Sequence, residues 1–121
     1  MPRTLIVDDD EDMRILVRSA IERANEDLEV VGEAANGAQA IEQWRTTNPD
    51  VIVLDYRLPD MTGLEVAEAI LSQQPEQAIV VFTAFAAAIP ARTASAIGIR
   101  AVMDKRELRA VPDAIRRHAS G

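Results

Sequence analysis

Five times along the chain of 121 residues, a short apolar run is followed by a segment with helical periodicity. The apolar runs that we predict to be strands are residues 4–7, 28–33, 51–54, 78–82 and 101–103. The predicted helices are residues 13–24, 38–45, 64–71, 91–97 and 112–119. This alternation predicts a doubly wound α/β domain, in which a five-stranded parallel sheet carries helices on both faces, joined by right-handed crossovers.

The third apolar run, Val-Ile-Val-Leu at residues 51–54, contains no polar residue and is rich in β-branched side chains. Such a run is typical of a strand that is covered on both faces. In open sheets of this kind, ligands bind beyond the carboxyl ends of the strands, at the point where the strand order reverses. The residues that follow each run are therefore the candidates for a functional site.

Polar or ionisable residues directly follow four of the five predicted strands. They are Asp8, Asp9 and Asp10 after the first strand, Asp55 after the third, Thr83 after the fourth, and Asp104 and Lys105 after the fifth. Because the strand interiors are apolar, we expect these polar side chains to gather at one edge of the sheet.

Size and composition indicate a single globular domain over residues 1–121, with 48% hydrophobic residues. The chain has no Cys, which excludes disulfides and thiolate metal sites, and its single His disfavours a His-rich metal site. No apolar run approaches the roughly 20 residues of a membrane span and no signal-peptide pattern opens the chain, so we expect a cytoplasmic protein without membrane contact. The net charge of −7 argues against direct binding of nucleic acid by this domain.

Five consecutive acids, residues 8–12, begin where the first predicted strand ends. Asp8 and Asp9 with Asp55 would form a cluster of three carboxylates, which requires a hard cation to neutralise it. Oxygen ligands without His or Cys favour Mg²⁺ or Mn²⁺, and Mg²⁺ commonly shares its coordination with a phosphate. The structural alternative is that the acids cap the first helix and favour its dipole. It explains residues 10–12 well but Asp8 and Asp9 less well, because they come too early.

Asp55 is a candidate nucleophile. A carboxylate at the tip of a buried strand and beside a cation can attack phosphorus and form an aspartyl phosphate. The Thr83 hydroxyl could donate to a phosphoryl oxygen, and the Lys105 ammonium could pair first with the carboxylate and then with the phosphate. Each signal is weak alone, but together they supply the positioning and charge neutralisation that phosphoryl transfer requires.

Four stretches, LIVDDDEDMR, PDVIVLDYRLPDMTGLE, VVFTAF and AVMDK, closely resemble the receiver domains of two-component response regulators, in the same order and over essentially the whole chain. The resemblance implies the flavodoxin-like (βα)5 fold with strand order 2-1-3-4-5. It also implies that Asp8, Asp9, Asp55 and the backbone carbonyl of Arg57 bind Mg²⁺. The other implied site residues are Thr83, Ala84 and Lys105 around the phosphate, with Pro59 and Gly63 in structural places, Gly63 allowing the turn into the third helix.

In receiver domains, the acceptor aspartate takes its phosphoryl group from the phospho-His of a sensor histidine kinase or a phosphotransfer protein, and here Asp55 has that place. The resemblance implies a switch that catalyses only its own phosphorylation and dephosphorylation. Phosphorylation is expected to alter the face built by the fourth helix, the fifth strand and the fifth helix, and thereby to control an effector or partner. The side chain of Arg57 is expected to modulate how fast water reaches the acyl phosphate.

Two residues depart from the pattern of receiver domains. The family often has an aromatic switch residue that moves together with the threonine, Thr83 here, but the corresponding residue is Val102, whose short and stiff side chain cannot act in that way. A proline usually follows the lysine, often through a cis bond, but Arg106 stands there, so we expect a trans bond since a cis non-proline bond costs about 2.5–4 kcal/mol.

The segment after Thr83, residues 84–98, is rich in alanine and has Arg92 as its only ionisable residue. One interpretation is a helix with alanine chosen for its propensity. The other is a docking surface or a homodimer interface, because contiguous exposed apolar patches often mark interfaces.

Two other functions are compatible with parts of the sequence. A phosphatase of the haloacid-dehalogenase type would use the Asp8 and Asp10 pair, but it would leave Asp55 and Thr83 without a role. The second function is that of a receiver that binds a partner without being phosphorylated. The departures at Val102 and Arg106 are compatible with it. Because the chain ends soon after its last predicted helix, we expect either a receiver that stands alone or an amino-terminal domain with an effector after it.

Overall fold

The computed structural model describes residues 2–24 and 27–119. The strands are β1 (Arg3–Val7), β2 (Glu29–Ala34), β3 (Val51–Leu54), β4 (Ala78–Thr83) and β5 (Ala101–Asp104). The helices are α1 (Glu11–Ala24), α2 (Gly37–Thr47), α3 (Gly63–Gln73), α4 (Ala91–Ile97) and α5 (Val111–His118), with short 3-10 helices η1 (Ala86–Ala88) and η2 (Lys105–Ala110). Every predicted strand and helix is present, with each boundary within two residues of its prediction.

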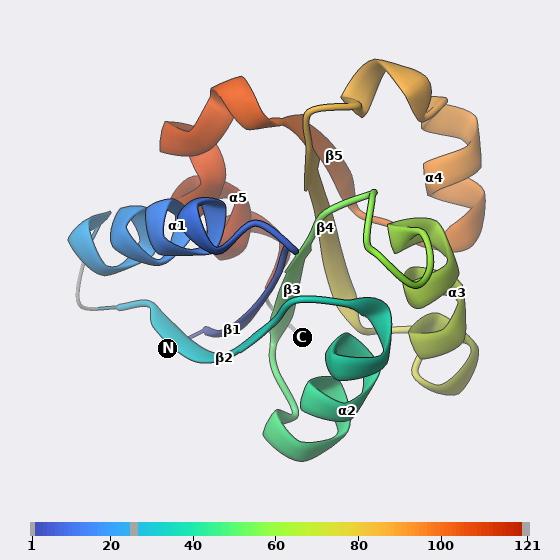
Figure 1. Cartoon of the computed structure of the whole chain (residues 1–121), viewed down its shortest axis with the longest axis horizontal. Coiled ribbons are helices and arrows are strands. Elements are labelled where there is room, and N and C mark those ends of the chain that lie inside the picture. The colour runs from blue at the N-terminus through green and yellow to red at the C-terminus, as the bar shows by residue number, and fades with distance from the viewer. Residues whose placement is uncertain (1, 25–26, 120–121) are drawn as a thin grey trace.

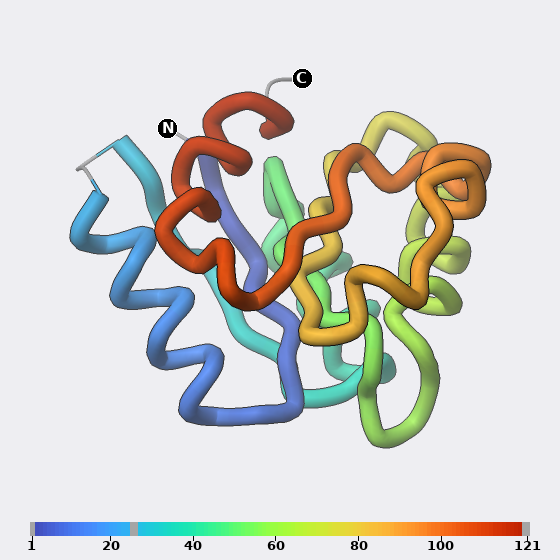
Figure 2. The backbone as a smooth tube through the Cα atoms, turned by 90° about the horizontal axis from the view of Figure 1, so that it is seen from above, coloured from blue at the N-terminus to red at the C-terminus, as the bar shows by residue number. Residues whose placement is uncertain are grey.

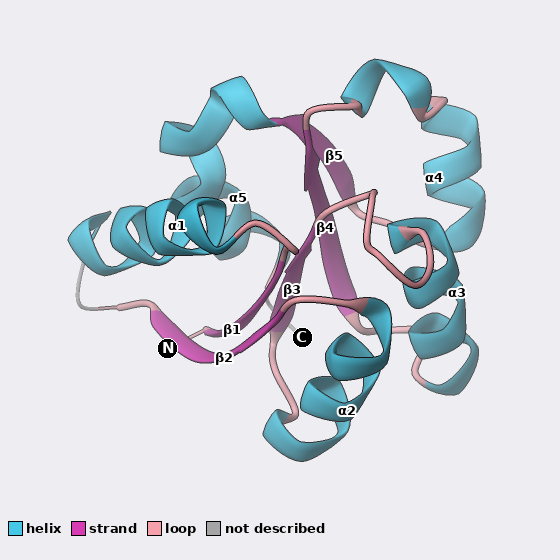
Figure 3. Cartoon of the chain, in the orientation of Figure 1, coloured by secondary structure: helices cyan, strands magenta, loops and turns pink. Residues whose placement is uncertain are grey.

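The five strands are parallel and lie in the order β2-β1-β3-β4-β5, which confirms the predicted doubly wound topology (Figure 3). Helices α1 and α5 cover one face of the sheet, and α2, α3 and α4 cover the other (Figure 1). The strand order reverses between β1 and β3, which are neighbours in the sheet although β2 comes between them in the chain. The carboxyl ends of these two strands therefore form the crevice at which α/β folds of this type bind ligands.

Successive side chains of each strand point to opposite faces, so the strands contribute to two apolar cores. Leu5 and Ile52 pack toward α2 and α3, whereas Ile6 and Val53 pack toward α1 and α5. All four side chains are at most 2% exposed. This two-sided burial explains why these strands read as apolar runs rather than as alternating patterns.

Side chains cap several of the helices where they begin. The Asn36 carboxamide accepts a hydrogen bond from the backbone N–H of Gln39 and starts α2. Thr62 and Glu65 form a capping box at the start of α3, and Asp104 and Glu107 form another at the start of η2. These bonds satisfy backbone N–H groups that have no partner inside the helix.

The loop between β3 and α3 is attached to the start of α2. The Asp60 carboxylate accepts hydrogen bonds from the backbone N–H groups of Gly37 and Ala38, at 2.7 and 2.9 Å. These bonds hold the pKa of Asp60 below its ordinary value. The loop that carries Arg57 is thus anchored at its far side to another element.

One expectation on the backbone is met in the described residues, 2–24 and 27–119. No peptide bond there is cis, so the bond between Lys105 and Arg106 is trans, as predicted. No helix in that part of the chain combines the length and apolarity that crossing a membrane requires.

Candidate functional site

Residues at or just after the carboxyl ends of β1, β3, β4 and β5 meet at one edge of the sheet. Backbone pairing aligns the strand ends: the N–H of Asp55 donates to the carbonyl of Val7 at 2.9 Å, and Thr83 lies opposite Asp104 in the register of β4 and β5. The parallel order therefore brings together residues that are far apart in the sequence.

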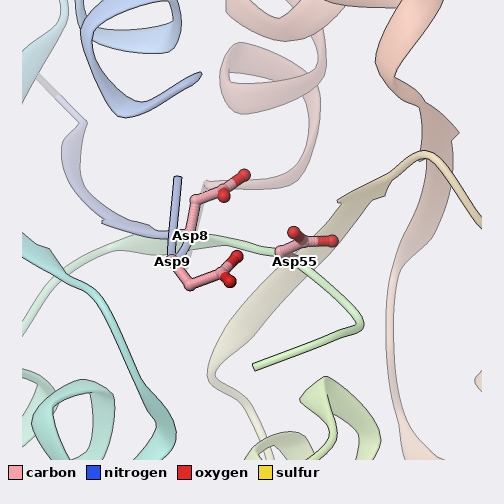
Figure 4. A group of neighbouring side chains, drawn as sticks. All are labelled: Asp8, Asp9 and Asp55. Carbon is pink, nitrogen blue, oxygen red and sulfur yellow. The ribbon is translucent and has the colours of Figure 1, made fainter. Parts of the chain in front are cut away.

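Asp8, Asp9 and Asp55 form a cluster of carboxylates at this edge. One oxygen from each lies within 4.8 Å of the other two. Figure 4 shows Asp8 and Asp9 at the end of β1 and Asp55 at the end of β3, with their carboxylates directed toward the same space. Asp8 and Asp55 are 3% and 6% exposed, whereas Asp9 is exposed. Clustered carboxylate oxygens with one exposed member suit a hard divalent cation such as Mg²⁺.

Lys105 holds the two buried acids together. Its Nζ lies 2.8 Å from Oδ2 of Asp8 and 3.0 Å from Oδ2 of Asp55. Burial lowers the pKa of Lys105, but the hydrogen bonds and negative charges of both aspartates outweigh that effect and raise it above its ordinary value. Lys105 is therefore a stable ammonium ion, positioned beside the candidate nucleophile.

Burial is the largest influence on the pKa of Asp8. It raises the pKa of Asp8, and the negative charge of Asp55 raises it further, while hydrogen bonds from Lys105 and from the backbone N–H of Asp10 oppose the rise. The site thus concentrates negative charge that Lys105 offsets at close range, the only such cation among residues 2–24 and 27–119. A bound cation would relieve that repulsion.

Asp55 is held by hydrogen bonds to both of its carboxylate oxygens. Oδ1 accepts from the backbone N–H of Tyr56 at 2.7 Å, and Oδ2 accepts from Lys105. Gly63 lies against the backbone of the same residue, where a Cβ atom would be 2.2 Å from the carbonyl oxygen of Asp55. At the start of α3, glycine is thus required by the close approach of the backbone to Asp55 and not by a positive φ, since Gly98 is the only glycine with positive φ among the described residues.

Thr83 ends β4 at the same edge and is fully buried. Its hydroxyl oxygen accepts a hydrogen bond from the backbone N–H of Phe85 at 3.1 Å. A hydroxyl that accepts one bond can still donate its own hydrogen to another oxygen. The next residue, Ala84, is exposed and adds only a methyl group beside the site.

Arg57 follows Asp55 by two residues, and its side chain is exposed. Its guanidinium carbon lies 4.1 Å from the centre of the Phe85 ring, a cation–π contact that links the loops after β3 and β4. A backbone bridge between Arg57 and Thr62 closes the intervening turn. The role of the Arg57 carbonyl as a metal ligand remains a prediction.

Val102 lies on β5, partly buried against the core. It lines a groove of about 410 Å³ together with residues of η1 and α4 that include Ala86, Ile89 and Ala94. The residue that family resemblance marks as a switch position thus borders an open apolar groove.

The acidic run divides between the carboxylate cluster and helix α1. The Asp10 carboxylate accepts a hydrogen bond from the backbone N–H of Asp12 at 3.0 Å, and Glu11 and Asp12 lie in the first turn of α1. One residue near the run was missed in the sequence: Arg14, whose guanidinium donates to the backbone carbonyl of Asp8. Its only sequence signal is a basic residue one turn into a helix that starts with acids.

A family model, sequence relatives and solved structures all relate this chain to response regulators. A family model of the response regulator receiver domain matches residues 4–116. The chemotaxis protein CheY of Thermotoga maritima is 37% identical over 82 residues, covering 68% of this chain and 67% of that protein. A protein-glutamate methylesterase/protein-glutamine glutaminase of Methanosarcina acetivorans is 38% identical over 81 residues, 67% of this chain, and the chain spans 23% of that relative's length. The solved response regulator domain of T. maritima CheB has the same fold, with a TM-score of 0.88 at 24% identity, covering 98% of this chain and 96% of that one.

Proposed function

This chain belongs to the response regulator receiver family, and we propose that it is a phosphorylation-dependent switch in which Asp55 accepts the phosphoryl group. The observation that carries the proposal is the contact of Lys105 with Asp55 at 3.0 Å, within a cluster of carboxylates that also includes Asp8 and Asp9. This arrangement combines a nucleophile, a fixed positive charge and cation ligands at one edge of the sheet.

Phosphorylation consists of one displacement at phosphorus. A carboxylate oxygen of Asp55 attacks the phosphorus of a phospho-His on a histidine kinase or a phosphotransfer protein. The new O–P bond forms as the N–P bond breaks, and the imidazole nitrogen leaves with the electron pair. Hydrolysis returns the protein to its first state. Water attacks phosphorus, the bond from phosphorus to the Asp55 oxygen breaks, and its electron pair stays on the Asp55 carboxylate, while inorganic phosphate leaves and a proton of the water is released to solvent.

Asp8, Asp9, Asp55 and the carbonyl of Arg57 would hold Mg²⁺, or Mn²⁺ in its place. The cation supplies charge neutralisation for the phosphoryl oxygens when it is bound. The fit rests on the spacing of the three carboxylates, whose candidate ligand oxygens lie within 4.8 Å of one another, and on the exposure of Asp9, which leaves the cluster open to solvent.

Lys105 and Thr83 would stabilise the product. Because the Lys105 ammonium already bonds Oδ2 of Asp55, it can follow the negative charge as the carboxylate becomes an acyl phosphate. The Thr83 hydroxyl can donate to a phosphoryl oxygen, for which the neighbouring Ala84 leaves room. Movement of Thr83 would shift the segment that starts with Phe85, whose N–H it binds.

The output of the switch would be a change in the face formed by α4, β5 and α5. An aromatic residue on β5 cannot take part, because that position is Val102. We therefore assign the response to Thr83 and to the loop before α4, with the groove beside Val102 as the space into which that loop can move. The partner would be an effector, another protein or a second copy of the chain bound through α4.

The haloacid-dehalogenase alternative has less support. It requires Asp10 to work beside Asp8, but the Asp10 carboxylate caps α1 through the N–H of Asp12. The third acid of the cluster is Asp55, which that mechanism does not use.

The test is incubation with acetyl phosphate and Mg²⁺, followed by mass spectrometry of the intact protein. We expect an adduct of about 80 Da, one phosphoryl group, in the wild type and none in Asp55→Asn. An unmodified wild type that nonetheless binds Mg²⁺ would favour a receiver that acts without phosphorylation. An adduct that persists in Asp55→Asn but disappears in Asp8→Asn would support the phosphatase.

A further inference from the structure

The backbone of Asp8 is hydrogen-bonded on both sides. Its N–H donates to the carbonyl of Ala34 on β2 at 3.0 Å. Its carbonyl accepts from Nη1 of Arg14 on α1 at 2.7 Å. Asp8 is therefore connected to both elements that flank the end of β1, and Figure 2 shows α1 and β2 side by side at the left of the molecule.

Arg14 is itself held in place by Glu33, the residue before Ala34. Its Nε lies 3.1 Å from Oε1 of Glu33, and its side chain is only 15% exposed. The other oxygen of Glu33 accepts from Nε of Arg18 at 2.7 Å. Arg14 thus uses two different edges of its guanidinium group at once, one on Glu33 and the other on the Asp8 carbonyl.

The contact of Arg14 with the Asp8 carbonyl restrains the backbone that leads to Asp9. This carbonyl belongs to the planar peptide unit that leads into Asp9. The following peptide unit is held as well, since the N–H of Asp10 donates to Oδ1 of Asp8 at 2.9 Å. Asp9 therefore sits between two fixed peptide units, although it is exposed to solvent.

We propose that Arg14 is a positioning residue for the cation site: by fixing the Asp8–Asp9 peptide unit it keeps the Asp9 carboxylate directed toward Asp8 and Asp55. This inference rests on the proposed function, which requires the three acids to bind Mg²⁺ together. Without Arg14, the peptide unit can rotate, and mutual repulsion drives the exposed Asp9 carboxylate away from the two buried ones. The residue acts through the backbone, because its hydrogen bonds go to the Asp8 carbonyl and to Glu33.

The chain offers a matched control in Arg18. It pairs with the same Glu33 and also lies on α1, but its hydrogen bonds go to Glu33 and Glu22 and not to Asp8. Replacing Arg18 removes a similar charge and a similar ion pair while leaving the bond to the Asp8 carbonyl in place. A difference between Arg14→Ala and Arg18→Ala therefore reports on that bond.

The experiment is a calorimetric titration of the full chain with Mg²⁺, alongside thermal unfolding without Mg²⁺. We expect Arg14→Ala to weaken Mg²⁺ binding about tenfold, as is usual when a residue that orients metal ligands is lost, and Arg18→Ala to change it less than about twofold. Arg14→Lys should resemble Arg14→Ala, because one ammonium cannot serve Glu33 and the Asp8 carbonyl in the same directions. Arg14→Ala should lose somewhat more thermal stability than Arg18→Ala, because it also removes the hydrogen bond to the Asp8 carbonyl.

A readout that needs no metal is the amide NMR spectrum of the free protein. The signals of Asp9 and Asp10 should move or broaden in Arg14→Ala and stay in place in Arg18→Ala. Should Arg14→Ala fail to fold, Glu33→Ala serves instead, since it removes the acceptor of Arg14 Nε and is expected to weaken Mg²⁺ binding by a smaller factor.

The outcomes separate the two proposals. Wild-type protein that binds Mg²⁺ normally, with Arg14→Ala equal to Arg18→Ala in affinity and in the Asp9 signal, overturns the positioning role and leaves the proposed function intact. Wild-type protein that binds no Mg²⁺ overturns both.

Discussion

Asp8 is a buried carboxylate, and burial disfavours its ionised form. Because burial, and then the charge of Asp55, raise the pKa of Asp8, the folded protein holds its proton more tightly than the unfolded chain does. Ionised Asp8 therefore destabilises the fold. This cost is absent below the ordinary pKa of about 3.8, grows as pH rises above that value, and is complete above the folded-state pKa.

We expect Asp8→Asn to raise the free energy of unfolding of the Mg²⁺-free protein at pH 7 by about 1 kcal/mol, because the cost of burying a charge is removed. The gain should shrink as pH falls toward about 4, where Asp8 of the wild type regains its proton. Urea unfolding followed by circular dichroism, from pH 4 to pH 8, measures it. Asp9→Asn is the control, since Asp9 is exposed and its gain should be smaller. A gain from Asp8→Asn that did not change with pH would contradict this account.

Thr4 carries the one buried side-chain polar atom without a hydrogen-bond partner in the part of the chain that the structure describes. The residue is fully buried in β1. Thr4→Val replaces the hydroxyl by a methyl group of the same shape, and valine also suits a strand. We expect stabilisation of about 1 kcal/mol, measured by denaturant unfolding, because the desolvation penalty of the hydroxyl disappears.

Thr47→Val provides the contrast for the Thr4 variant. The Thr47 hydroxyl donates to the carbonyl of Gln43 at 2.7 Å, so its removal loses a hydrogen bond. Stabilisation in both variants would show that the exchange of a hydroxyl for a methyl group, rather than the unsatisfied state of the Thr4 hydroxyl, causes the effect.

At the scale of elements, α3 is positioned by its contact with the end of β3. Gly63 is the first residue of α3, and its N–H donates to the carbonyl of Tyr56 at 2.5 Å. A Cβ atom there would lie 2.2 Å from the backbone oxygen of Asp55, which cannot move without shifting the candidate nucleophile. The helix start and the site are thus one rigid unit.

Gly63→Ala is expected to destabilise the fold by about 2 kcal/mol, as overpacking does, and to slow phosphorylation by acetyl phosphate. Gly32→Ala is the control: the nearest atom to its added Cβ, at 2.5 Å, is the end of the flexible Gln43 side chain, which can swing aside. Unfolding free energies and adduct formation by mass spectrometry test both variants. Equal loss in the two variants would contradict the close-approach argument.

Most elements could be predicted because helices cover both faces of the sheet, so that the strands are apolar throughout and stand out in the sequence. Helix η2 was not predicted, since its residues carry no apolar period, although Asp104 and Glu107 have the spacing of a capping box. The start of α1 was placed two residues late, because its first turn consists of acids that cap it rather than of core residues.

The candidate site could be predicted to the level of its acids, Thr83 and Lys105, because each follows a strand directly. The contacts of Arg14 with Glu33 and of Arg57 with Phe85 could not. Each joins two segments that meet only in the folded chain, and neither residue carries a local pattern that distinguishes it from an ordinary surface arginine.

At the scale of the whole molecule, the sheet separates two apolar cores. Helices α1 and α5 pack on one core, and α2, α3 and α4 on the other. Asp55 lies where the strand order reverses, and the chain leaves this edge of the sheet toward both faces. Lys105 leads into η2 and α5, whereas Phe85 leads into η1 and α4. A change of charge at Asp55 can therefore bias both ends of the α4, β5 and α5 face.

The outer surface of α4 suits a second copy of the chain. Ala91, Ser95 and Ala96 are exposed, and small side chains allow two helices to approach closely. The molecule carries a net charge of −7, yet Arg92 is the only ionisable residue in the segment from 84 to 98. This face therefore lacks the negative charge by which two copies would otherwise repel each other, and its apolar character favours contact.

We expect the 13.2 kDa chain to elute from gel filtration as a monomer and to shift to the volume of a dimer with Mg²⁺ and beryllofluoride, a stable mimic of the phosphoryl group. Ala96→Glu should abolish the shift, because it places a buried negative charge opposite its symmetry mate. It should still form the phosphoryl adduct, since Ala96 lies outside the site. Ser72→Glu, which adds the same charge at an exposed position of α3, should dimerise like the wild type. An unchanged wild-type elution volume, or a dimer that tolerates Ala96→Glu, would exclude α4 as the phosphorylation-driven interface.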